Sequence, residues 1–287
     1  MSLSLCGCSV PQRSPDRITI GTFNMEWFGD NSADDHKPRT EVDDKLLAEV
    51  LRDTDADLLA VQEVENSQAM ERLLRILPRY GMKEYRFVLG ASGNKQHVGF
   101  LFRPPVQVDM VREVESIAVE KGRTRAGLLA ECSVSGFSWQ MLAVHLKSTS
   151  HADSTPALEE RSRTLRQAQA AQIRAWADST RNALQQQNQK AKMIILGDCN
   201  DSPRKKRSAL DTLRSAPYLT FLTEDLQSCS YSALPTIDHI LVSDALRQRV
   251  VPGTLRTVNF RAMLPDNVMG RISDHCPVVV QISTEKH

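Results

Sequence analysis

The sequence predicts one mixed α/β domain in which sheets pack on each other and helices cover them from outside. Short apolar runs typical of buried strands are interspersed with segments whose apolar residues recur at helical spacing, and no break in composition separates two domains. With 287 residues, 41% of them hydrophobic, the chain can build one sizeable core. Residues 1–16 are expected to be a flexible lead-in, and residues 17–287 form the domain.

The predicted elements follow from periodicity of two or of 3.6 residues, with proline and polar clusters marking their ends. In the first part of the chain we expect a strand at 17–24, a polar loop at 30–41, a helix at 43–52, a strand at 57–63 and a helix over 70–77 that ends at Pro78. In the remainder we expect strands at 97–102, 105–114, 126–134 and 137–145, a long helix at 156–187, and strands at 193–197, 237–242, 250–258 and 277–282.

Charge and hydropathy restrict the partners. The net charge is +1, so the chain as a whole does not attract polyanions, and a nucleic-acid partner would require a local basic patch. No run of 18 apolar residues is present, which excludes a transmembrane segment from the expectation. We expect a monomer.

The six cysteines lack the CxxC spacing of zinc sites and do not resemble a disulfide framework. Cys132, Cys199 and Cys276 are expected to be buried free thiols. Near the N-terminus, Leu5-Cys6-Gly7-Cys8 is similar to a bacterial lipobox, although the preceding apolar stretch is too short for a signal peptide. A periplasmic or lipid-anchored location is expected if Cys8 is lipidated, and a cytoplasmic location otherwise.

Polar residues fall at the ends of the predicted strands, where rigid elements can bring them together. They are Asn24, Glu63, His145, Asp198, Asn200, Asp238, Asp274 and His275. A set rich in carboxylate and amide oxygens favours Mg²⁺, with Mn²⁺ or Ca²⁺ as alternatives, over zinc. Taken singly, each residue has a structural alternative, because residues 197–203 alone would also make an ordinary turn.

Six motifs in order carry a resemblance to a known family. They are Thr22-Phe-Asn24-Met-Glu26, Val61-Gln-Glu63, Ala143-Val-His145-Leu-Lys147, Gly197-Asp198-Cys-Asn200, Ile237-Asp238-His and Ser273-Asp274-His275-Cys-Pro277. From about residue 17 to 282 the chain resembles the endonuclease/exonuclease/phosphatase superfamily. Residues 98–104 and 250–253 look most like its deoxyribonuclease branch.

The resemblance implies an α/β (α+β) four-layer sandwich of two packed mixed β-sheets flanked by α-helices. It also implies hydrolysis of phosphate esters with a divalent metal ion that polarises a phosphoryl oxygen. Glu63 would be the principal metal ligand, with Asn24, Glu26 and Asp274 around the ion.

The resemblance also implies catalytic roles. Asp198 would orient or deprotonate water and Asn200 would donate a hydrogen bond to the phosphate, while Asp238 would fix and charge His275. His145 occupies the place of a second catalytic histidine.

The usual glutamate partner of His145 falls near Gln96, so His145 is expected to donate a hydrogen bond without acting as a full acid. Arg125 and Lys147 would add positive charge there, unless they are simply solvated.

The substrate is less determined by the sequence. Arg204, Lys205, Lys206 and Arg207 are expected either to hold backbone phosphates or to be the solvated start of a helix. Nucleic-acid phosphodiester hydrolysis is the leading expectation. The alternatives are a phosphatase or a phospholipase/sphingomyelinase-type enzyme acting on a small or lipid phosphoester and, less favoured because every catalytic motif is intact, a non-catalytic binding module.

Overall fold

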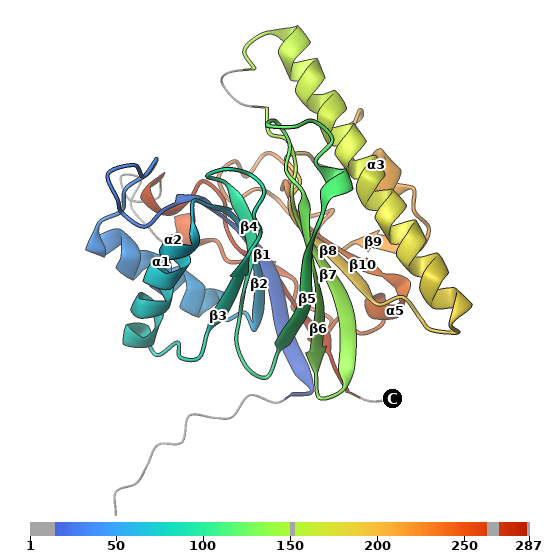
Figure 1. Cartoon of the computed structure of the whole chain (residues 1–287), viewed down its shortest axis with the longest axis horizontal. Coiled ribbons are helices and arrows are strands. Elements are labelled where there is room, and N and C mark those ends of the chain that lie inside the picture. Colours follow the sequence, from blue (N-terminus) through green and yellow to red (C-terminus); the bar gives the residue numbers. More distant parts are fainter. Residues whose placement is uncertain (1–14, 150–152, 263–269, 286–287) are drawn as a thin grey trace, which may run out of the picture.

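The predicted fold class is confirmed by a computed structural model, in which two mixed six-stranded sheets pack face to face between helices (Figure 1). The structure describes residues 15–149, 153–262 and 270–285. The lipobox-like segment around Cys8 lies outside these residues, so its prediction stays untested.

The strands are β1 (Arg17–Phe28), β2 (Leu58–Val64), β3 (Arg86–Leu89), β4 (His97–Phe102), β5 (Gln107–Val114), β6 (Gly127–Val134), β7 (Phe137–His145), β8 (Met193–Asp198), β9 (Leu219–Phe221), β10 (Asp238–Ser243), β11 (Arg256–Thr257) and β12 (Val278–Ser283). The helices are α1 (Glu41–Thr54), α2 (Ser67–Ile76), α3 (Pro156–Gln186), α4 (Asp211–Arg214) and α5 (Asp244–Arg247), with short 3-10 helices at Leu77–Tyr80, Glu115–Ile117 and Phe260–Ala262. The first sheet has the order β11-β12-β1-β2-β4-β3 and the second β5-β6-β7-β8-β10-β9.

Each sheet contains one parallel pair at its centre, and the other pairings are antiparallel. β1 pairs with β2, and the connection between them includes α1. β7 pairs with β8, and the connection between them includes α3. Because a parallel pair places both carboxyl ends at the same edge, each sheet offers two adjacent strand ends there.

Three apolar layers explain the four-layer arrangement. The strands alternate, so Ile194 of β8 lies in the cluster between the sheets while Ile195 packs in the layer under α3. In the same way Ala60 of β2 faces the second sheet, and Leu59 packs in the layer under α1 and α2. The helices therefore cover the outer faces, and α3 extends beyond the sheets at the upper edge in Figure 1.

The least accurate secondary-structure prediction is the strand expected at 250–258. Only Arg256–Thr257 is a strand, joined by an isolated bridge between Val250 and Ile282. Gly253 has φ of 74°, and the turn that it forms interrupts the run. The short elements β3, β9, α4 and α5 were not predicted, because segments of three or four residues carry too little periodicity.

The prediction of buried free thiols was wrong for Cys276 and is confirmed for Cys132 and Cys199. Cys229 and Cys276 form a disulfide with a Cα–Cα distance of 6.1 Å, so Cys276 is not a free thiol. The two are 47 residues apart, and only the tertiary fold brings the segment before β10 beside the segment before β12. Cys132 and Cys199 are buried free thiols, as expected. No helix among the described residues is long and apolar enough to cross a membrane.

Candidate active site

The polar strand ends identified in the sequence meet at one edge of the sandwich. The strand register sets this up in the second sheet, where His145 of β7 lies opposite Asp198 of β8, and Asp198 lies opposite Asp238 of β10. Three site residues thus form a row across neighbouring strands. The first and last described residues lie away from this edge, as shown by the hydrogen bond from the Thr284 amide to the Asp16 carbonyl beside the start of β1.

Glu63 leaves β2 through an irregular backbone. Its φ is 57°, and the pairing of β2 with β4 shifts register between Val61 and Val64. Such a bulge turns a side chain out of the regular pleat, and left-handed backbone in a non-glycine residue persists only where its surroundings hold it. Asn24 at β1 helps to hold it, since its Nδ2 donates to Glu63 Oε1 at 3.0 Å.

Asp198 is fixed by a glycine before it and an asparagine after it. Gly197 has φ of 145°, and a Cβ added there would lie 1.9 Å from the Val144 carbonyl oxygen, so only glycine fits. The backbone N–H of Asn200 donates to Asp198 Oδ1 at 2.8 Å and its Nδ2 donates to Oδ2 at 3.1 Å. Asn24 Nδ2 also donates to Oδ2 at 3.0 Å, which connects the two sheets.

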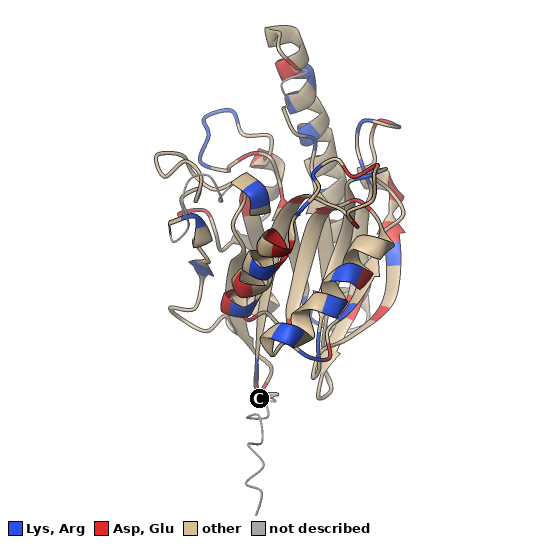
Figure 2. Ribbon diagram, turned by 90° about the vertical axis from the view of Figure 1, so that its left-hand side faces the viewer, with Lys and Arg blue, Asp and Glu red and all other residues tan. Residues whose placement is uncertain are grey.

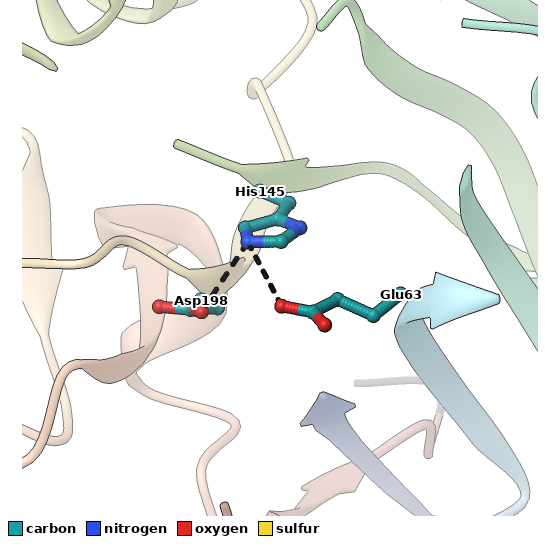
Figure 3. A group of neighbouring side chains, drawn as sticks. All are labelled: Glu63, His145 and Asp198. Atoms are coloured by element: carbon teal, nitrogen blue, oxygen red, sulfur yellow. Dashed lines mark ion pairs between the residues drawn. The ribbon is translucent and has the colours of Figure 1, made fainter. Parts of the chain in front are cut away.

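His145 lies between the two carboxylates (Figure 3). Its Nε2 is 3.5 Å from Asp198 Oδ2 and 3.7 Å from Glu63 Oε1. Burial lowers the pKa of His145 well below its ordinary value, and the nearby charge of Arg125 lowers it further, so the imidazole is neutral at neutral pH. Burial likewise raises the pKa of Asp198 to about 7, with His275 opposing the shift.

The donor chemistry of this group fits a divalent cation. One polar atom from each of Glu63, His145 and Asp198 lies within 4.8 Å of the others. Two carboxylates this close repel each other, and a cation relieves that repulsion. A second such group is formed by Asp198, Asp238 and His275.

In that second group, Asp238 and His275 form a close pair. His275 Nδ1 lies 2.8 and 3.0 Å from the two Asp238 carboxylate oxygens. A carboxylate only accepts, so Nδ1 carries the hydrogen and Nε2 is left 3.7 Å from Asp198 Oδ2. Burial by itself lowers the pKa of His275, but the charges of Asp238 and Asp198 outweigh it and raise that pKa well above its ordinary value.

Gln96 contacts Arg125 in this structure. Its Oε1 accepts from Arg125 Nη2 at 2.8 Å, while His145 Nδ1 and Arg125 Nη1 are buried and have no hydrogen-bond partner. Burial lowers the pKa of Arg125, although Glu63 and Asp198 oppose the change. Arg125 lines the cleft together with Glu63, although its unpaired Nη1 atom is buried.

Glu26 and Asp274, the two remaining predicted metal ligands, contact each other. The Asp274 amide donates to Glu26 Oε2 at 2.8 Å, and Lys37 Nζ lies 2.6 Å from the same oxygen. The Asp274 side chain is 63% exposed. Sequence reasoning missed Lys37 and also Ser273, whose hydroxyl donates to the Asn24 carbonyl and accepts from the His275 amide. The serine of the Ser-Asp-His motif was the available signal.

A cleft of about 1420 Å³ opens beside Glu63. Trp27, Glu63, Asp274 and Lys147 are among the residues that line this cleft. The described cationic lining residues are Lys95, Lys121, Arg123, Arg125 and Lys147. Lys147 Nζ is 3.2 Å from Asp153 Oδ2, so part of its charge is balanced by the protein itself.

The four cations at 204–207 are exposed and lie in turns, so they do not begin a helix. Arg204 is 3.6 Å from Asp225, Lys205 is 2.9 Å from Asp201, and Arg207 is 3.5 Å from Glu160. Figure 2 shows both signs of charge along the projecting end of α3 and the neighbouring loops. Carboxylates therefore neutralise much of this cluster, and the cleft offers the better-placed cations.

Comparisons with known proteins agree with the fold. The model of the Endonuclease/Exonuclease/phosphatase family matches residues 21–275. The chain belongs to this family. Membership supports the expectation of a metal-dependent phosphoesterase. A comparison with curated proteins gave no match.

Similar solved structures share the fold at low sequence identity. Truncated TDP2 of Caenorhabditis elegans has a TM-score of 0.62 at 16% identity, covering 93% of this chain and 98% of the other. The 3' phosphatase NExo from Neisseria, bound to a product DNA hairpin, has a TM-score of 0.59 at 18% identity, covering 93% of this chain and 99% of the other. A mannosyl-6-phosphatase of Bacteroides thetaiotaomicron has a TM-score of 0.58 at 13% identity, covering 92% of this chain and 98% of the other.

Proposed function

We propose that this protein is a divalent-metal-dependent nuclease that hydrolyses phosphodiester bonds. The observation that carries the proposal is the convergence of Glu63, His145 and Asp198 with the Asp238–His275 pair at one edge of the sandwich, beside the cleft that Glu63 lines. The cleft supports a polymeric substrate, because about 1420 Å³ exceeds the 300–1,000 Å³ typical of small-molecule sites. A similar structure that holds a DNA product supports the same substrate class.

We assign the proton transfers to the protein's own residues. Asp198, with its pKa raised to about 7, is positioned to orient water and take its proton. His275 carries a proton at neutral pH, and Asp238 holds its Nδ1 so that Nε2–H is free to donate toward the phosphate. Arg125 lines the cleft and contributes positive charge there, while the buried, neutral His145 lies beside Glu63 and Asp198.

Glu63 would be the principal metal ligand, with Asn24, Glu26 and Asp274 around the ion, while the neighbouring Asp198 and His145 would act on water and phosphate beside it. When bound, a divalent cation supplies Lewis-acid polarisation of a phosphoryl oxygen. Asn24 Nδ2 donates a 3.0 Å hydrogen bond to Glu63 Oε1, which orients this carboxylate. Mg²⁺ suits these oxygen donors, with Mn²⁺ or Ca²⁺ as alternatives.

We also infer that the protein works in an oxidising compartment. The Cys229–Cys276 disulfide supports this location, because such bonds persist outside the reducing cytosol. A periplasmic or lipid-anchored protein, as the Cys8 segment suggests, is consistent with the inference.

The experiment compares supercoiled plasmid, RNA, a chromogenic phosphodiester and a chromogenic phosphomonoester, each with Mg²⁺ and with chelator. We expect metal-dependent cleavage of nucleic acid and of the diester. Glu63→Ala should remove most activity without unfolding the protein and should respond to excess Mg²⁺, because a principal ligand is lost. The control is Glu131→Ala, which removes an exposed carboxylate on β6. Full activity in chelator, or hydrolysis of the monoester alone, would contradict the proposal.

A further inference from the structure

Trp27 is placed unlike the other two tryptophans of the chain. Trp139 is buried between the sheets, and Trp176 packs against the layer under α3. Trp27 belongs to none of the three apolar clusters formed by the described residues, is half-buried, and lines the cleft together with Glu63. Core packing therefore does not account for an indole at this position.

The backbone beneath Trp27 is held in an uncommon conformation. Glu26 and Trp27 have φ of 45° and 53°, in the left-handed region, and the pairing of β1 with β2 shifts register between Asn24 and Phe28. The guanidinium of buried Arg39 stabilises this bulge by donating to the carbonyls of the two residues and of Met25, at 2.7–3.1 Å. Strain retained in this way is typical of places where the direction of a side chain matters.

The indole ring is also supported on one side. The His36 ring stacks on it with centroids 4.1 Å apart and an interplanar angle of 30°. The His36 amide donates to Glu65 Oε1 at 2.8 Å, which fixes the loop that carries the imidazole. An indole ordered before the substrate arrives loses little further freedom when a second ring stacks on it.

We propose that Trp27 stacks on the nucleobase of a nucleotide next to the scissile phosphate. The inference rests on the proposed nuclease function and narrows it to substrates with a base at that place. Among the described residues that line the cleft, Trp27 is the only aromatic one, and Glu63 and Asp274 line the same cleft. A nucleobase has the planar face that an indole binds, whereas a sugar phosphate or an aliphatic lipid headgroup has none.

The test measures kcat/KM on two matched phosphodiesters, one a dithymidine dinucleotide and the other the same diester with base-free tetrahydrofuran residues. Wild type, Trp27→Ala, Trp27→Phe and the control Trp176→Phe are compared. We expect Trp27→Ala to lower kcat/KM on the dinucleotide by roughly 5- to 150-fold, the range that one base–aromatic stack provides. On the base-free diester the change should stay within about twofold, and Trp27→Phe should recover most of the loss.

The outcomes distinguish failure of the proposed stacking by Trp27 from failure of the proposed nuclease function. Equal losses on both diesters would show that Trp27 only supports the fold of the site, and no loss on either would show that no base contacts it. Both results overturn the role of Trp27 while leaving the nuclease proposal standing. If the wild type hydrolyses neither diester, the proposed function fails, and the inference fails with it.

Discussion

The Asp238–His275 pair makes a prediction about how two substitutions combine. Both carboxylate oxygens of Asp238 lie within 3.0 Å of His275 Nδ1, and the aspartate's proposed role is to orient and charge this imidazole. Once the imidazole is removed, the carboxylate has no further part in the reaction. Asp238→Asn and His275→Ala should therefore be grossly non-additive.

The size of the effect follows from the role. Loss of a positioned acid/base group costs on the order of 10²–10⁴ in kcat. If the double variant is no slower than His275→Ala alone, the coupling equals the whole effect of Asp238→Asn, which is about 2.7–5.4 kcal/mol at 1.36 kcal/mol per factor of ten. Independent sites would instead multiply, giving a combined loss of about 10⁴–10⁸.

The assay is a double-mutant cycle in kcat on the chromogenic diester, with melting temperatures for all four proteins. Since the charge of Asp238 raises the pKa of His275, Asp238→Asn should move the basic limb of the pH–rate profile to lower pH. Multiplicative losses, together with lowered melting temperatures and an unmoved pH profile, would show that Asp238 is a structural residue and would refute the dyad.

Two further predictions concern stability. Burial lowers the pKa of His239 to about 4 from 6.5, so the unfolded chain takes up a proton before the folded one. The free energy of unfolding should therefore decrease as the pH is lowered below about 6.5, and His239 should account for about 2 kcal/mol of this decrease between pH 7 and pH 5. Denaturant titrations at both pH values should show that decrease in the wild type and a decrease smaller by about 2 kcal/mol in His239→Gln. Cys229→Ser should lower the free energy of unfolding by about 4 kcal/mol, the chain-entropy value for a link across 47 residues, and should slow catalysis because Cys276 follows His275. Reduction of the wild type should reproduce both effects, whereas a thiol-insensitive wild type with an active Cys229→Ser variant would contradict the second prediction.

The sequence predicts the parts of the site that depend on strand ends. Asn24, Glu63, His145 and Asp198 each follow an apolar run. His145 and Asp198 end their strands, as expected for residues that rigid elements bring together, whereas β1 continues for four residues beyond Asn24. Taken alone, the Gly-Asp motif at Gly197 is also typical of an ordinary turn, and only the structure shows that a Cβ has no room there.

What the sequence does not reveal depends on contacts between distant segments. The bulges at Glu26–Trp27 and Glu63 leave no periodic signal, because one or two extra residues do not change the apolar pattern of a strand detectably. Arg39 was read as part of a polar loop, yet its guanidinium also donates to the Ile272 carbonyl across 233 positions. The disulfide between Cys229 and Cys276 escaped prediction for the same reason.

The two parallel strand pairs explain why a site of this kind lies at this edge. In the first sheet β1 and β2 deliver Asn24 and Glu63, and in the second β7 and β8 deliver His145 and Asp198. Since the sheets pack face to face, one hydrogen-bond donor, Asn24 Nδ2, reaches Glu63 in its own sheet and Asp198 in the other. The core between the sheets thereby fixes the separation of Glu63 from Asp198, and the geometry of a site shared by two sheets depends on the packing between them.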